Sequence, residues 1–184
     1  MSDTMNSLIE CAVSPTEFGK VEGHGTSRRV EVRREIKTSI AKTWEAITNA
    51  DQMSKWFTEC DFELIEGSQI ALHFSEDAKY RRKEHTNYGV IKLIHPQNIF
   101  GYTWETDGVS SWVQFDLIEG DHGSTLLTIM SIGMTAKDGW NVGVGWHQMT
   151  ERLAHYLEND EAVLLEFDRV KEIYLHYKAL EKAD

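Results

Sequence analysis

The sequence is poor in cysteine, in long apolar runs and in basic residues. Cys11 and Cys60 are its two cysteines, and neither lies in a CxxC pair or a zinc-type spacing, so we expect reduced thiols. No apolar run approaches the roughly 18 residues that span a bilayer. The segment Met1–Glu10 also lacks the charged start and apolar centre of a signal peptide. These absences favour a cytoplasmic protein.

Positive charge is scarce relative to negative charge. Nineteen Lys and Arg stand against 30 Asp and Glu, which gives a formal net charge of −11 at pH 7. Such a field repels phosphate backbones and anionic lipid surfaces, so we expect neither nucleic acid nor a membrane as a partner. The length of 184 residues fits one domain, at roughly 100–200 residues per domain, with room for an extra element.

Alternation of apolar and polar residues predicts seven antiparallel strands joined mostly by short turns. In the first strand, Val30, Val32 and Ile36 share one face with the charged Arg34. Residues 1–27 form an irregular segment, with a short strand near Leu8–Val13 as an option. The predicted strands are Arg28–Ile36, Phe62–Ile65, Ile70–Phe74, Tyr88–Ile94, Ile99–Trp104, Ser111–Ile118 and Thr125–Gly133.

Helical spacing occurs on both sides of the strand-rich region. Ser39 resembles an N-cap for a helix that carries Trp44, and a short second helix ends near Trp56. A long amphipathic helix spans Val142–Leu157, and its apolar stripe consists of Val142, Trp146, Met149, Leu153 and Leu157. We therefore predict an α+β fold in which a curved antiparallel sheet covers one long helix.

The last segment, Asp160–Lys182, has a second helical pattern. Its apolar residues step by four and three positions and are Val163, Phe167, Val170, Tyr174 and Tyr177. Two heptads are too few for an independent coiled coil, so this stripe docks on its own domain or on a second subunit. We favour docking on its own domain, with a homodimer or another protein partner as the alternative.

Several residue groups, taken in order, resemble those of a known family. They are Arg34, Trp44-Glu45-Ala46-Ile47-Thr48, Lys55-Trp56-Phe57, Gly89, Tyr102-Thr103-Trp104-Glu105, Ser124-Thr125-Leu126-Leu127-Thr128, Gly133, Gly145-Trp146 and Leu153. The pattern is similar to the START-like SRPBCC superfamily, and within it to the proteins named after the activator of the heat-shock protein 90 ATPase. It covers residues 28–158 and leaves an N-terminal extension, 1–27, and an additional C-terminal helix, 159–184.

The resemblance implies a helix-grip fold, in which a seven-stranded sheet curls around the long helix and leaves a cavity between them. Relatives include lipid carriers, hormone receptors, polyketide cyclases and the co-chaperone, so the fold alone does not select an activity. Strand parity and the stripe of the long helix place an apolar, mostly aromatic set of side chains at this cavity, with Trp56 and Phe57 near its mouth. The predicted lining residues are Arg34, Trp56, Phe57, Phe74, Tyr102, Trp104, Phe115, Ile129, Trp146 and Met149.

Arg34 is the one charge that strand parity places among these apolar residues. A buried guanidinium needs a partner, so we expect an internal carboxylate, with a ligand carboxylate as the alternative. The eight histidines show no HxH or HExxH spacing, so we expect no metal and no cofactor. His147 is expected to be a solvated imidazole beside Trp146. Cys60 is expected to be a small buried hydrophobe, not a nucleophile.

Three functions are compatible with these features. We favour non-catalytic binding of an apolar or aromatic small molecule, because binding sites are concave and mostly apolar with a few polar anchors. A co-chaperone-like interaction module, with a role in the stress response, is favoured by the acidic surface and the extra helix. An enzyme such as a cyclase, dehydratase or hydrolase would need at least two convergent polar groups in the cavity, and we identify no catalytic residue.

Overall fold

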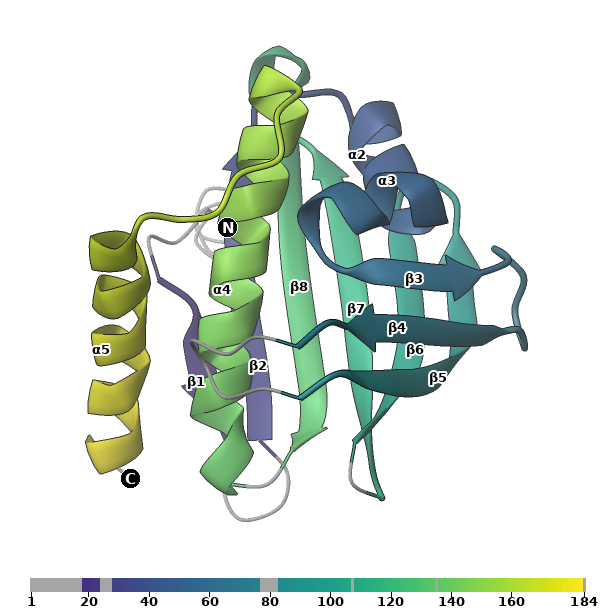
Figure 1. Cartoon of the computed structure of the whole chain (residues 1–184). Helices are drawn as coiled ribbons and strands as arrows, with labels where there is room; N and C mark the ends of the chain where they lie inside the picture. Colours follow the sequence, from purple (N-terminus) through teal and green to yellow (C-terminus); the bar gives the residue numbers. More distant parts are fainter. Residues whose placement is uncertain (1–17, 24–27, 77–82, 107, 135, 184) are drawn as a thin grey trace, which may run out of the picture.

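Eight antiparallel strands form one open sheet in the computed structural model, which describes residues 18–23, 28–76, 83–106, 108–134 and 136–183 (Figure 1). The order across the sheet is β1-β2-β8-β7-β6-β5-β4-β3, so the chain's first strands lie beside its last. The strands are β1 (Lys20–Glu22), β2 (Arg28–Ile36), β3 (Glu59–Phe62), β4 (Gln69–Phe74), β5 (His85–His95), β6 (Ile99–Thr106), β7 (Val109–Glu119) and β8 (Thr125–Met134).

The strand count is one higher than predicted. β1 lies within residues 1–27, where we predicted an irregular segment, and it places Val21 opposite Val30 of β2. Three residues with one apolar side chain are too few to show a period of two, so this strand has no recognisable pattern in the sequence. The optional strand at Leu8–Val13 and the thiol of Cys11 lie outside the described residues.

Two strands, β3 and β5, also begin three residues earlier than predicted. β3 ends at Phe62, where we predicted a strand to begin, because residues 63–68 form the turn into β4. Gly67 has a φ of 93°, a conformation that favours glycine, and its N–H donates to the carbonyl of Ile91. β5 begins at His85, which pairs with Phe74, so residues that precede the predicted strand at Tyr88 also belong to the sheet.

Four α-helices in the described part of the chain accompany the sheet. α2 (Ile40–Thr48) is capped by Ser39, whose hydroxyl accepts from the Lys42 N–H, and α3 (Ala50–Trp56) is capped by Asn49. The long helix α4 (Ala136–Asn159) and the last helix α5 (Phe167–Ala183) follow β8, and a 3₁₀ turn spans Asp121–Gly123. The predicted N-cap at Ser39 and the predicted end of the second helix near Trp56 are confirmed.

The sheet curls around α4 (Figure 1). Strands β2 and β8 run along the helix, whereas β3, β4 and β5 cross it at a steep angle, with α2 and α3 at one end. The apolar faces of sheet and helix together bury the core, and the predicted α+β architecture is confirmed. No described helix has the length and apolar character needed to cross a membrane.

Helix α5 packs beside α4 on the side of β1 (Figure 1). Ile173 and Tyr177 are fully buried, so the helix docks on its own domain. The predicted apolar stripe was partly wrong, because Phe167 and Tyr174 are 62% and 39% exposed. Regular steps of three and four residues omitted Ile173, which lies between Val170 and Tyr177 and is fully buried.

Candidate ligand-binding site

Nine of the ten predicted lining residues meet in one apolar cluster between the sheet and α4. They come from six different elements, or from the residue that ends one of them, so residues far apart in sequence contact one another here. The end of α3 supplies Trp56 and Phe57, β4 supplies Phe74, β6 supplies Tyr102 and Trp104, β7 supplies Phe115, β8 supplies Ile129, and α4 supplies Trp146 and Met149. We call these nine residues the aromatic cluster.

Trp146 of α4 is the centre of the aromatic cluster. Its ring stacks on Phe57, with centroids 5.3 Å apart, and meets the rings of Trp104 and Phe115 edge-on at 5.8 Å and 5.7 Å. Offset stacking and edge-to-face contacts are the favourable arrangements for aromatic rings. The indole of Trp146 therefore points from the helix into the sheet, as predicted.

Burial varies across the aromatic cluster. Trp56, Tyr102, Phe115 and Ile129 are fully buried or nearly so. Phe57, Phe74, Trp104 and Met149 are half-buried and pack against this centre. The ring of Phe74 also stacks on His85, with centroids 5.1 Å apart. The cluster thus extends from the core to the surface, and the half-buried rings mark its solvent-facing side.

Two buried polar groups of the aromatic cluster differ in their hydrogen bonding. The indole N–H of Trp56 donates to the carbonyl of Ala46 at 2.9 Å. The hydroxyl of Tyr102 is buried and has no hydrogen-bond partner among the described residues. Burial raises the pKa of Tyr102 far above its usual value, and burial also raises the pKa of the neighbouring Cys60 thiol to about 11. Both groups are therefore protonated at neutral pH.

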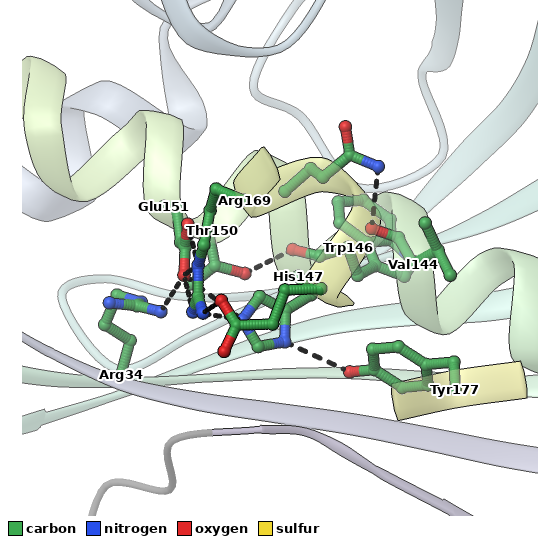
Figure 2. A network of polar contacts seen from close by, with 10 residues as sticks. Arg34, Val144, Trp146, His147, Thr150, Glu151, Arg169 and Tyr177 are labelled. Atoms are coloured by element: carbon green, nitrogen blue, oxygen red, sulfur yellow. Dashed lines mark hydrogen bonds and ion pairs between the residues drawn. The ribbon is translucent and has the colours of Figure 1, made fainter. Parts of the chain in front are cut away.

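Arg34 lies outside the aromatic cluster and belongs to a polar network (Figure 2). Its Nη2 donates to Oε1 of Glu151 on α4 at 2.9 Å, which is the internal carboxylate that we expected. Arg169 of α5 pairs with the same carboxylate, through its Nε at 3.1 Å and its Nη2. One glutamate thus joins β2, α4 and α5. Arg34 is therefore the one predicted lining residue that does not join the aromatic cluster, and its partner is Glu151.

His147 is buried, so the prediction of a solvated imidazole was wrong. Its side chain is 1% exposed, because Phe18 and α5 cover it. Its Nε2 lies 3.2 Å from Oε1 of Glu151, and its Nδ1 lies 3.4 Å from the hydroxyl of Tyr177 (Figure 2). With about 3.6 residues per turn, His147 and Glu151 share a helix face next to that of Trp146.

The network holds Glu151 as an anion. Burial alone would raise the pKa of Glu151, but hydrogen bonds from His147 and Arg169 and the charges of Arg34 and Arg169 outweigh it and set the value at about 2. Arg169 also pairs with Glu172 at 2.6 Å. In the ion pair of Glu151 with Arg169, each residue therefore has a second charged partner, which is Arg34 for Glu151 and Glu172 for Arg169. We infer that these ion pairs hold α5 against the rest of the domain.

Two features of the sequence indicate parts of this network. Arg34 on an apolar strand face required a carboxylate. His147 and Glu151 are four residues apart on a helix, which places them side by side. No local signal pointed to Arg169 or Tyr177, because their positions depend on the docking of α5.

The sheet, the single helix that it grips and the apolar cluster between them define a helix-grip protein. The family model described as "Activator of Hsp90 ATPase homolog 1-like protein" matches residues 37–158, and the chain belongs to that family. No curated protein matches the sequence.

Solved structures share the fold at low sequence identity. CalU16 from Micromonospora echinospora is 22% identical, with a TM-score of 0.70 over 89% of this chain and 98% of that one. EF2215 from Enterococcus faecalis, a conserved protein of unknown function, is 19% identical, with a TM-score of 0.69 over 97% and 98%. BPP1335 from Bordetella parapertussis is 20% identical, with a TM-score of 0.65 over 90% and 93%. At these identities the likeness concerns the fold alone.

Proposed function

We propose that this protein binds an apolar or aromatic small molecule, without catalysis, between the curled sheet and α4. The observation that carries the proposal is the aromatic cluster, whose rings continue from the buried centre to half-buried positions at the surface. Aromatic side chains offer large, rigid surfaces for stacking, and small-molecule sites are typically lined in this way. The ligand would contact Phe57, Phe74 and Trp104 first, because these rings are partly exposed.

The polar groups of this region argue against catalysis. Tyr102 and Cys60 both hold their protons at neutral pH, because burial raises their pKa values. A protonated thiol is a poor nucleophile, and a phenol with a raised pKa is a poor general base. The ionised Glu151 is engaged by two arginines and is held at a pKa of about 2, so it is also a weak base. These properties favour binding over an enzymatic reaction.

Ligand capture tests the proposal directly. The protein purified without denaturation should carry a small molecule visible by native mass spectrometry, or should show a rise in melting temperature with members of a lipid and aromatic panel. Phe57→Leu should weaken binding at least fivefold, because it removes a stacking surface at the solvent-facing side. Phe167→Leu makes the same change at a 62% exposed position of α5 and should leave binding unchanged. Absence of both a copurified molecule and a thermal shift would contradict the proposal.

A protein-interaction module is a second candidate. It is favoured by the family description, which names the activator of the Hsp90 ATPase, and by the net charge of −11. The exposed apolar residues Leu164, Phe167 and Leu175 would supply contacts on the last helix and the segment before it. A pulldown with the chaperone from the same cell, followed by an ATPase assay, tests this function. Stimulation that is lost in Phe167→Ser would support it over ligand binding.

A further inference from the structure

The hydroxyl of Tyr102 is an unsatisfied polar group within an apolar surrounding. Tyr102 is fully buried, and its ring packs near Phe100, Trp104 and Phe115, with centroids 5.5 to 6.5 Å away. Its oxygen is buried and has no hydrogen-bond partner within the described ranges. By contrast, the buried indole of Trp56 in the same cluster is satisfied by the Ala46 carbonyl.

Such a group is uncommon in folded proteins. Roughly nine in ten or more buried polar groups have a partner, because an unpaired one keeps the cost of lost hydration. Phenylalanine would fill the same ring position without that cost. A hydroxyl at this position therefore indicates a partner that is present only part of the time.

We propose that the Tyr102 hydroxyl donates a hydrogen bond to a neutral acceptor, such as a ketone or quinone carbonyl, on a flat ligand stacked in the aromatic cluster. This inference rests on the proposed binding function and adds the chemical class of the ligand. The ligand supplies the acceptor, and the surrounding rings supply the stacking surfaces.

The charges around the aromatic cluster favour a neutral ligand over an anion. A carboxylate held by one phenol would lose most of its hydration without a cation to compensate. Arg34 and Arg169 are both paired with Glu151. Arg152 touches the cluster through Met149, with Nη1 and Sδ 3.5 Å apart, and its Nε donates to the carbonyl of Val163. Tighter binding of the anion 2-naphthoate than of the neutral 2-acetylnaphthalene would therefore indicate that Arg152 binds the ligand.

Matched pairs of probes separate the hydrogen bond from stacking. Each pair replaces a carbonyl oxygen with a methylene group on the same skeleton: acetophenone and α-methylstyrene, 2-acetylnaphthalene and 2-isopropenylnaphthalene, and fluorenone and 9-methylenefluorene. The anion 2-naphthoate is the charged comparison. Dissociation constants are measured by calorimetry on the full chain, and tryptophan fluorescence reports occupancy near Trp104 and Trp146.

The wild type should bind the ketone of the best-fitting pair about tenfold more tightly than its hydrocarbon partner, since the hydrocarbon leaves the buried hydroxyl unpaired. Tyr102→Phe should abolish this preference by weakening only the ketone. Tyr88→Phe makes the same change at a 49% exposed residue and should preserve the preference. 2-Naphthoate should bind more weakly than 2-acetylnaphthalene.

The possible contrary results have different meanings. Equal binding of ketone and hydrocarbon by the wild type would overturn the inference while supporting the proposed function. A ketone preference that survives Tyr102→Phe, or tighter binding of 2-naphthoate, would also overturn the inference alone. Binding of no probe in any pair would overturn the inference, whereas the proposed function is decided by the copurified molecule and by the thermal shift with the lipid and aromatic panel.

Discussion

Two tyrosines of this protein are buried equally but differ in what their hydroxyls contact. Tyr102 and Tyr177 are both fully buried, and burial raises the pKa of each. The hydroxyl of Tyr177 lies 3.4 Å from Nδ1 of His147, and a backbone hydrogen bond from Gly19 opposes part of the rise in its pKa. The hydroxyl of Tyr102 has no partner in the part of the chain that the structure describes. The same substitution should therefore have opposite effects at the two positions.

Tyr102→Phe should leave the free energy of unfolding of the ligand-free protein unchanged or raise it by about 1 kcal/mol, because it removes an unsatisfied hydroxyl. Tyr177→Phe should lower it by about 1 kcal/mol, because it removes hydrogen bonds that exist. Urea unfolding of the two variants beside the wild type measures both values. A loss of more than about 1 kcal/mol in Tyr102→Phe would show that its hydroxyl already has a partner.

Glu151 is the residue on which the polar network depends. It accepts from Arg34 at 2.9 Å and from Arg169, and its side chain is 12% exposed. Glu151→Gln keeps the shape but leaves two arginines facing a neutral amide. We expect a loss of about 2–3 kcal/mol in unfolding free energy at pH 7, because breaking a buried pair leaves uncompensated charge. Glu172→Gln changes an exposed partner of Arg169 and should cost less than about 1 kcal/mol.

The contribution of Glu151 should depend on pH in a defined direction. Its pKa falls from 4.5 to about 2 in the folded protein, so the folded state favours the anion. Stabilisation is complete above about pH 4.5 and is lost as the pH falls toward 2. The difference in stability between wild type and Glu151→Gln should therefore shrink over this range, as measured by urea unfolding at several pH values. A difference that stays constant down to pH 2.5 would contradict the role assigned to the carboxylate.

At the scale of elements, two glycines of α4 have opposite surroundings. A Cβ at Gly143 would overlap the ring of Tyr177 on α5, whereas a Cβ at Gly145 would meet nothing within 4 Å. Both positions lie inside the helix, where alanine is intrinsically favoured by about 1 kcal/mol. Steric conflict decides the outcome at Gly143, and propensity decides it at Gly145.

Gly145→Ala should raise the melting temperature, and the free energy of unfolding should rise by about 0.5–1 kcal/mol. Gly143→Ala should lower the melting temperature, because the added methyl group displaces α5. Differential scanning calorimetry of the two variants gives the signs. Limited proteolysis should cut Gly143→Ala within residues 160–166 faster than it cuts Gly145→Ala. Equal stabilisation of the two variants would mean that Tyr177 does not pack against α4 as described.

The elements were predictable wherever their pattern was local. Alternation over β2, β7 and β8 and the helical stripe through Trp146 each repeat within one segment, so the sequence indicated both the element and its buried face. Strand parity and the helical stripe together indicated most of the aromatic cluster. The burial of His147 and the face of α5 were not predictable from local periods, because they follow from contacts between segments distant in sequence. β1 was missed for another reason, since its three residues are too few to show a period.

At the scale of the whole molecule, α4 lies between an aromatic region and a polar, charged region. Trp146 faces the aromatic cluster, and His147 and Glu151 face β2 and α5 (Figure 2). The family model covers residues 37–158, which hold α2, α3, strands β3 to β8 and nearly all of α4, but not β1, β2 or α5. This division agrees with the proposed function, in which the aromatic cluster binds the ligand while α5 and the polar network stabilise the domain.

If the two sides of α4 act independently, their variants should show separate effects. Ile173→Ala removes a fully buried side chain of α5 and should cost about 2–5 kcal/mol in unfolding free energy, whereas Leu175→Ala, at a 54% exposed position, should be nearly neutral. Neither should change the dissociation constant for the best-fitting ketone probe by more than about twofold, because distant sites without shared partners are additive.

Phe57→Leu should give the reverse pattern, with weak effects on stability and at least fivefold weaker binding. Urea unfolding and calorimetric titration of the same three proteins provide both measurements. Weaker probe binding by folded Ile173→Ala would show that α5 is coupled to the aromatic cluster through α4. In that case the ion pairs of Glu151 would influence the position of Trp146, and the last helix would contribute to the binding site.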